Sequence, residues 1–391
     1  MLFCTAFRTS WVGCLLAVGV LAGCSGDGTQ STLSPEAALG ERAFHEPLLS
    51  ASGQQSCASC HASASGHSAP NALAAQLGGQ HLDVQGLRTS PALRYLAKNT
   101  PFHFDEEDTP TGGFFWDGRA NTLAEQAAGP LLNPREMANP DKASVVAKIG
   151  QTAWASNFKA LYGAEVLQNT DVAFDKLLQA LERYQREDSE FNAYTSKYDA
   201  VLRGQATLTA PEARGLALFN DENKGNCAAC HPSGKSADGS HPLFTDFTYD
   251  NLGVPRNRNI TANNDPSYFD LGLCARPELA ARQDLCGAFK VPSLRNVALR
   301  QTFFHNGKFN TLKDALNFYV QRDTNPEKWY PLNADGSVQK FDDIPVQWQA
   351  NVNTAEAPYG RQPGQAPALN DAEIDDLIAF LKTLSDGWKN H

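Results

Sequence analysis

The sequence contains little methionine, few charged residues and no excess of positive charge. Among its 391 residues are 2 Met, and only 19% carry a charge, against roughly 25% in globular domains. The 43 Asp and Glu outnumber the 33 Lys and Arg, which gives a formal net charge of -10. Nucleic-acid binding needs a cationic surface, so no nucleic-acid partner is expected. With 42% hydrophobic residues, the chain is predicted to fold compactly.

The sequence also lacks a long apolar run. Its one apolar stretch, residues 11–22, spans about a dozen residues, whereas a membrane-crossing helix needs roughly 20. A basic residue precedes the stretch and Leu21-Ala22-Gly23-Cys24 ends it, a pattern typical of an export signal that resembles a bacterial lipobox. We therefore expect a signal peptide at residues 1–24, a flexible tether at 25–33, and a periplasmic protein anchored through a lipid on Cys24 without spanning the membrane. An ordinary signal peptide that ends near a cysteine is the alternative.

Four of the nine cysteines belong to two copies of the pattern C-x-x-C-H. The copies are Cys57, Cys60 and His61, and Cys227, Cys230 and His231. This pattern is the attachment signature of c-type haem, because two thiols one helical turn apart can bond the porphyrin vinyl groups while the next imidazole ligates the iron. The sequence therefore predicts two haem c groups. Zinc is the alternative, but a zinc site usually takes its remaining ligands from a distant pair.

Two further cysteines remain after export. Cys274 and Cys286 follow a segment rich in turn signals and lie within a loop. In an oxidising compartment they are expected to form a disulfide with a structural role.

Each haem motif is preceded by a predicted helix with the same start signals. Ser34-Pro35-Glu36-Ala37 begins one, which continues through Gly40, and Thr209-Ala210-Pro211-Glu212 begins the other, which continues through Gly215. Ser or Thr at the N-cap and Pro in the first turn favour helix initiation.

Both halves also end in an amphipathic run, with apolar residues at helical spacing over 172–181 and 374–384. Strand patterns are scarce. We therefore predict a mostly α fold with two c-type cytochrome domains, at 34–205 and 206–391, plus long loops.

Several motifs resemble a known family. Phe115-Trp116-Asp117-Gly118-Arg119-Ala120 and the residues up to Glu136-Met137 resemble the signature of bacterial dihaem cytochrome c peroxidases and the related MauG proteins. The resemblance continues through 289–297 and 304–307, in the family's order, and covers nearly the whole mature chain. Within the family, residues 318–331 and the paired cysteines resemble the MbnH branch.

The resemblance implies roles for particular residues. Trp116 matches the tryptophan between the two haems, and Gln126 and Glu136 match the polar pair on the open face of the first haem, where Glu136 would shuttle a proton. The second haem takes its distal ligand fourteen residues after the position of His305. In peroxidases this ligand is Met, but here it is Tyr319, opposite His231. The alternative for Tyr319 is a buried aromatic in a core helix.

Two further assignments follow from the resemblance. His81 stands ten residues before Pro91, where peroxidases keep a histidine that ligates the first haem at rest, although MauG proteins lack this ligation. A surface histidine is the alternative, for His81 as for His67 and His103. The family's calcium ion would use the side chain of Thr89, where Asn is commoner, and carbonyl oxygens that correspond to Arg300 and Thr302.

The implied activity is peroxide-dependent oxidation of a partner protein. Hydrogen peroxide would produce a high-valent, two-ferryl state, and the MbnH resemblance implies conversion of tryptophan to kynurenine in an exported, MbnP-like copper-binding protein. One alternative is a dihaem cytochrome c peroxidase that reduces hydrogen peroxide with electrons from a small cytochrome. A second is a dihaem electron carrier without enzymatic activity.

Overall fold

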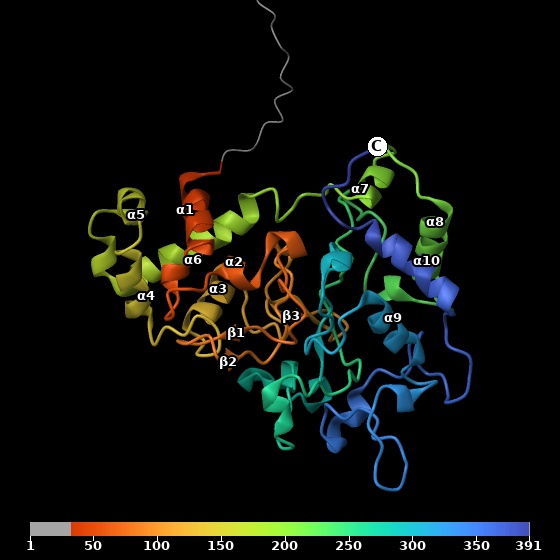
Figure 1. Cartoon of the computed structure of the whole chain (residues 1–391). Helices are drawn as coiled ribbons and strands as arrows, with labels where there is room; N and C mark the ends of the chain where they lie inside the picture. The colour runs from red at the N-terminus through yellow and green to blue at the C-terminus, as the bar shows by residue number, and fades with distance from the viewer. Residues whose placement is uncertain (1–32, 391) are drawn as a thin grey trace, which may run out of the picture. The chain divides into compact units, whose positions relative to one another are not determined.

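The computed structural model describes residues 33–390. The predicted signal peptide, the predicted lipid site Cys24 and most of the predicted tether lie outside these residues. The described part contains ten α-helices and three antiparallel pairs of two-residue strands, joined by long loops and short 3₁₀ turns (Figure 1). The predicted mostly α fold is therefore confirmed. None of the helices in residues 33–390 is long and apolar enough to cross a membrane.

Helices provide most of the regular structure between residues 33 and 390. They are α1 (Pro35–Phe44), α2 (Cys57–Cys60), α3 (Leu123–Leu132), α4 (Lys142–Ile149), α5 (Ala155–Tyr162), α6 (Thr170–Glu187), α7 (Lys197–Leu202), α8 (Ala210–Asn220), α9 (Leu312–Gln321) and α10 (Asp371–Lys382). The strand pairs are β1 (Leu77–Gly78) with β2 (Val84–Gln85), β3 (His103–Phe104) with β4 (Pro110–Thr111), and β5 (Tyr249–Asp250) with β6 (Phe289–Lys290).

The first apolar core forms where α1 packs against α6 (Figure 1). Ser34 caps α1, because its hydroxyl accepts a hydrogen bond from the N–H of Ala37 at 3.2 Å. Gly40 lies at the contact, and a Cβ at this position would collide with the backbone carbonyl of Ala180. The absence of a side chain at Gly40 therefore sets how closely the two helices approach.

The second apolar core repeats this arrangement with α8 and α10 (Figure 1). Thr209 and Glu212 form a capping box at the start of α8. Gly215 lies at the contact, where a Cβ would collide with the backbone carbonyl of Asp376. A glycine at the equivalent position of each helix pair thus permits the same close packing twice.

The similarity between the two halves of the chain also extends to the loops that precede α3 and α9. Phe115 and Phe304 both adopt the left-handed conformation, with φ of 68° and 65°, and each is followed three residues later by a left-handed glycine. Left-handed backbone is a marked exception for a bulky side chain, so its repetition identifies one tight turn built twice. Trp116 and His305, one residue further along, occupy equivalent positions in the two turns.

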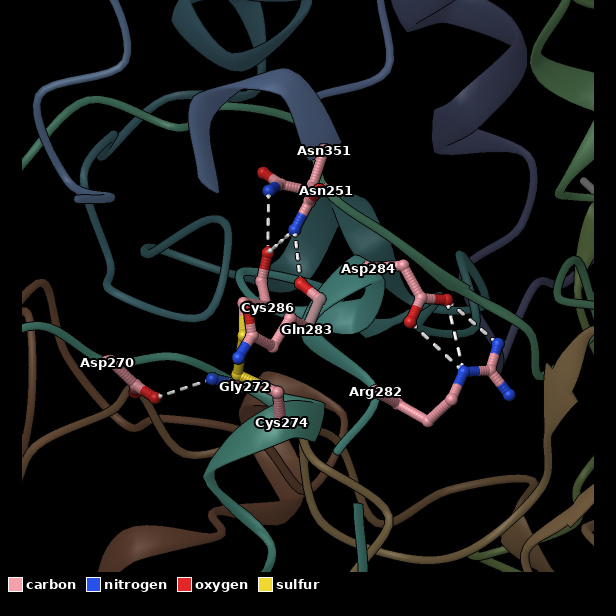
Figure 2. Close-up of a disulfide and its surroundings, with 9 residues drawn as sticks. All are labelled: Asn251, Asp270, Gly272, Cys274, Arg282, Gln283, Asp284, Cys286 and Asn351. Atoms are coloured by element: carbon pink, nitrogen blue, oxygen red, sulfur yellow. Dashed lines mark hydrogen bonds and ion pairs between the residues drawn. A yellow bond between two sulfur atoms is a disulfide. The ribbon is translucent and has the colours of Figure 1, made fainter. Parts of the chain in front are cut away.

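A disulfide joins Cys274 and Cys286 in the loop between β5 and β6 (Figure 2). The side-chain amides of Asn251 and Asn351 each donate a hydrogen bond to the carbonyl of Cys286 at 3.2 Å. Asp270 accepts a hydrogen bond from the N–H of Gly272 at the start of the same loop. The bridge therefore holds a loop of little regular structure against two distant segments.

Buried polar contacts connect segments that are far apart in the sequence. Asp386 accepts hydrogen bonds from the hydroxyl of Tyr95 and the amide of Asn296, both at 2.7 Å. Arg295 donates to both carboxylate oxygens of Asp199, at 2.9 and 3.0 Å, and neither side chain of this pair is more than 1% exposed. A fully buried ion pair is sensitive to loss of one partner, because the other charge is left uncompensated.

We predict that Arg295→Met lowers the free energy of unfolding by about 3–5 kcal/mol, because Asp199 keeps its buried carboxylate without the guanidinium. Denaturant unfolding of the purified protein, followed by far-ultraviolet circular dichroism, measures the change. Lys142→Met is the control, since it breaks an exposed ion pair with Asp171 and should leave the unfolding midpoint unchanged. A loss below about 1 kcal/mol in Arg295→Met would mean that the buried pair contributes little.

Candidate functional site

The C-terminal C-x-x-C-H motif opens onto a cavity of about 190 Å³. Cys227, Cys230 and His231 line this cavity, and neither thiol is engaged in a disulfide. The Nδ1–H of His231 donates to the carbonyl of Phe244 at 2.7 Å, which leaves Nε2 free. Burial lowers the pKa of His231 to about 4, so the ring is neutral, which is the form that ligates a metal.

The N-terminal motif has the same polar arrangement. Cys57 and Cys60 lie at the two ends of the single turn α2, and both thiols are free of disulfides. The Nδ1–H of His61 donates to the carbonyl of His67 at 3.2 Å. Burial lowers the pKa of His61 to about 4. Gln55 donates its side-chain amide to the sulfur of Cys60 at 3.4 Å.

His67 is a buried support for this site, so its interpretation as a surface histidine is wrong. Its side chain accepts a hydrogen bond from Nε of Arg94 at 3.1 Å, and its ring lies 4.2 Å from that of Phe191. His103, by contrast, is exposed. Nothing local in the sequence distinguishes the two, because the burial of His67 comes from contacts with distant segments.

Tyr319 lies on α9 and lines the same cavity as His231. Burial, together with the nearby thiols of Cys227 and Cys230, raises the pKa of the Tyr319 phenol. The phenol is therefore neutral in the chain by itself, and ionisation needs a cation bound in the cavity. The ring of Tyr319 stacks on Tyr359, whose other neighbour is the guanidinium of Arg322, 3.8 Å from the ring centroid.

Two buried threonines, Thr89 and Thr302, lie beside the cavity residues Trp116 and His305. The indole N–H of Trp116 donates to the carbonyl of Thr89 at 2.9 Å, and the N–H of Thr89 donates to the carbonyl of His305 at 2.8 Å. The hydroxyls of Thr89 and Thr302 are 2.8 Å apart. His305 is buried and stacks on Phe289, with ring centroids 3.6 Å apart. Trp116 and His305 both line the cavity.

An ion-pair cluster beside Trp116 is not evident in the sequence. Arg88 donates to both carboxylate oxygens of Asp270, at 2.6 and 2.7 Å, and to Asp117 at 2.7 Å. The backbone N–H of Lys290 donates to the carbonyl of Trp116 at 2.8 Å. These contacts fix the backbone on both sides of the indole. Arg88 and Asp270 are 182 residues apart, which explains why no sequence motif reveals them.

Glu136 lies in the loop after α3 and faces the N-terminal motif. Its carboxylate accepts a hydrogen bond from the amide of Asn133 at 2.8 Å. Burial raises the pKa of Glu136, partly offset by the charge of Arg119. The carboxylate is close enough to Cys60 for its charge to raise the pKa of that thiol. Gln126 lies half-buried on α3, ten residues earlier.

His81 is exposed in the turn between β1 and β2. A histidine that ligates a buried iron must itself be buried. The exposed position of His81 therefore does not bring it to the first haem site. The strand pair itself contacts the Glu136 loop, because the N–H of Gly79 donates to the carbonyl of Glu136 at 2.8 Å.

The residues of both motifs fit haem c. Each motif supplies two free thiols and a neutral imidazole that could ligate an iron, and the C-terminal cavity is lined largely by apolar side chains. Within residues 33–390, no group of three or more His, Cys, Asp or Glu side chains is placed to hold a metal ion. The zinc alternative would need such a group.

Comparisons with known proteins agree with the site residues in indicating a protein with two haem groups. A family model described as di-haem cytochrome c peroxidase matches residues 34–207. The methylamine utilization protein MauG of Paracoccus denitrificans is 36% identical over 390 residues, covering 96% of this chain and 95% of that protein. The crystal structure of the diheme peroxidase BthA from Burkholderia thailandensis has a TM-score of 0.83 at 40% identity, covering 91% of this chain and 87% of that chain.

A crystal structure of a MauG-like protein associated with microbial copper homeostasis is also similar, with a TM-score of 0.63, 25% identity and coverage of 91% of each chain. The match to MauG spans both haem motifs and the segments between them. The family model and BthA are peroxidases by name, which favours an enzyme over the electron-carrier alternative. The chain therefore belongs to the family of di-haem cytochrome c peroxidases and MauG proteins, as a haem-dependent peroxidase or oxidase with two haem c groups.

Proposed function

We propose that this enzyme uses hydrogen peroxide to oxidise a partner protein. Residues 34–205 would hold the haem that reacts with peroxide, and residues 206–391 would hold a haem ligated by His231 and Tyr319. When bound, the two haems supply the redox chemistry: each peroxide takes up two electrons and two protons to give two water molecules. The electrons would come from the partner.

Tyr319 carries this proposal. It lines the cavity that also contains His231. The sequence has 2 Met, of which Met1 lies outside the described residues and Met137 is buried in the first core. Met137 is thus unsuited to ligate the second haem. A tyrosine ligand stabilises oxidised iron, whereas methionine raises the reduction potential and suits a haem that receives electrons.

Glu136 and Gln126 would act on peroxide at the first haem. Glu136 takes a proton from the attacking peroxide oxygen and returns it to the departing oxygen, and Gln126 orients the two oxygens. A carboxyl group with a raised pKa suits both steps, since it holds a proton more readily than an exposed glutamate and can still release it. The amide of Asn133 would keep the carboxylate in place between the two transfers.

We predict that Glu136→Gln slows the reaction with peroxide by about 10²–10⁴-fold, because general acid–base catalysis is lost. Both haems should remain, as a haemochrome assay can verify. The wild-type rate should fall as the pH drops through the raised pKa of Glu136, which lies above the roughly 4.3 of a free glutamate. Stopped-flow spectroscopy measures both effects. A variant rate equal to the wild-type rate would refute the assigned proton transfer.

The partner is proposed to be an exported, MbnP-like copper-binding protein in which a tryptophan is converted to kynurenine. This conversion removes four electrons, so it takes two peroxides, with the added oxygen taken from water and one ring carbon released as formate. The MbnH resemblance and the similarity to a MauG-like protein associated with microbial copper homeostasis support this choice. Trp116, held between Thr89 and Lys290, would pass electrons between the haems. Oxidation would then occur where the partner docks, in the periplasm, with the enzyme anchored through a lipid on Cys24.

Tyr319→Met tests the function directly. We expect the potential of the haem at Cys227 and Cys230 to rise, and peroxide-dependent modification of the partner to give way to oxidation of a reduced small cytochrome. Spectroelectrochemistry and mass spectrometry of the partner measure the two effects. Tyr162→Phe, on α5, is the control and should change neither.

The competing function, a cytochrome c peroxidase, predicts a different wild-type behaviour. Steady turnover with a reduced small cytochrome, and no modification of a tryptophan-bearing partner, would establish that function instead.

A calcium ion is proposed near Thr89. Its ligands would be the hydroxyl oxygen of Thr89 and the backbone carbonyl oxygens of Arg300 and Thr302. The donors are uncharged, which implies weak binding with water completing the shell. Removal of calcium with EGTA should lower the thermal unfolding temperature, and added Ca²⁺ should restore it. Thr89→Val should abolish this response. An unfolding temperature that ignores EGTA would show that the wild-type protein needs no calcium here.

A further inference from the structure

Two guanidinium nitrogens of Arg300 are buried without a partner, on a side chain that is half-buried as a whole. Its Nε and Nη2 are inaccessible to solvent, and neither makes a hydrogen bond. The residue lines the cavity that contains Cys227, Cys230 and His231. A guanidinium keeps its proton at neutral pH, so Arg300 is a cation. A buried, unpaired cation is costly, which indicates that a counter-charge is missing from the chain by itself.

Other buried arginines of residues 33–390 do not share this feature. Arg88 binds Asp270 and Asp117, Arg295 binds Asp199, and Arg322 binds Asp323. Arg300 is the arginine in the described part of the chain whose buried nitrogens have no partner. The other three arginines are thus paired with carboxylates, whereas the buried nitrogens of Arg300, which lines the cavity, are unpaired.

The acidic residues of the cavity already have their own partners. Asp270 binds Arg88, and Asp343 accepts from Asn306 at 3.0 Å and lies 3.2 Å from Arg256. Asp250 and Glu356 both accept from the amide of Asn353 at 3.0 Å. None of these carboxylates forms an ion pair with Arg300, so its counter-charge is expected from outside the described residues. A haem attached in this cavity brings two propionate carboxylates.

We propose that Arg300 binds a propionate carboxylate of the haem attached at Cys227 and Cys230. A guanidinium presents several N–H donors in a plane and matches a carboxylate, and a charge-assisted pair inside a cavity is stronger than a neutral hydrogen bond. The inference goes beyond the proposed function, since it requires only the bound haem and neither peroxide nor a protein partner. The calcium proposal uses the carbonyl of Arg300, so the two do not compete for the same atoms.

The pair has a consequence for the haem iron. A cation near the porphyrin disfavours the ferric state, which carries the larger positive charge, and it also neutralises a propionate that would favour that state. Removal of the guanidinium should therefore lower the reduction potential of this haem. The haem at Cys57 and Cys60 serves as an internal reference, because Arg300 lines the cavity at Cys227 and Cys230.

The test compares Arg300→Gln, Arg300→Lys and the wild type as dihaem proteins. We expect Arg300→Gln to shift the ferric–ferrous equilibrium of the haem at Cys227 and Cys230 about tenfold toward the ferric form, about 59 mV for one electron. Arg300→Lys, which keeps the charge, should shift less. Spectroelectrochemistry measures the potentials, and infrared spectroscopy detects the change at the carboxylate. Arg203→Gln, at an exposed position, is the control and should change neither potential.

Three results would overturn the proposal. Unchanged potentials and an unchanged carboxylate band in haem-loaded Arg300→Gln would mean that the guanidinium does not contact a propionate. Equal shifts in both haems would indicate a general disturbance. A wild-type potential that depends on added acetate, with the dependence lost in Arg300→Gln, would identify a free anion as the occupant. None of these results depends on peroxide turnover, so the proposed function could fail while this proposal stands.

Discussion

The hydrogen bond between each motif histidine and a backbone carbonyl is the contact on which the rest of the site depends. It fixes which nitrogen carries the proton and turns the other toward the iron position. The acceptor in each case is a non-glycine residue in the left-handed conformation, His67 with φ of 53° and Phe244 with φ of 55°. Such backbone costs about 1–3 kcal/mol. It persists because both residues are buried among aromatic neighbours.

One helical unit, built twice, supports two different sites. The glycine contacts of α1 with α6 and of α8 with α10 are equivalent, as are the tight turns that place Trp116 and His305. What differs is the side chain beyond each turn. The first unit continues to Glu136, a carboxyl group that can move protons, and the second to Tyr319, an oxygen donor facing Cys227 and Cys230. This division is the basis of the proposed function, in which the first haem would react with peroxide and the second would be ligated by His231 and Tyr319.

Buried charges around the cavity either join distant segments or lie open to the cavity. The ion pairs of Arg88 and Arg295 hold together segments that are 182 and 96 residues apart, and so maintain the loops around the cavity. Arg300 has no such partner, and it lines the cavity that contains Cys227, Cys230 and His231. A low fraction of charged residues thus coexists with a high concentration of charge around the site.

The sequence by itself determined the features that depend on neighbouring residues. The spacing of Cys57, Cys60 and His61 places three groups within one turn, and N-caps such as Ser34 bond to backbone two or three residues away, so both are readable without a fold. Tertiary structure alone decided the burial of His67, the exposure of His81, and the contact of Thr89 with Thr302, 213 residues further along. These depend on which distant surfaces meet, and no local pattern encodes that.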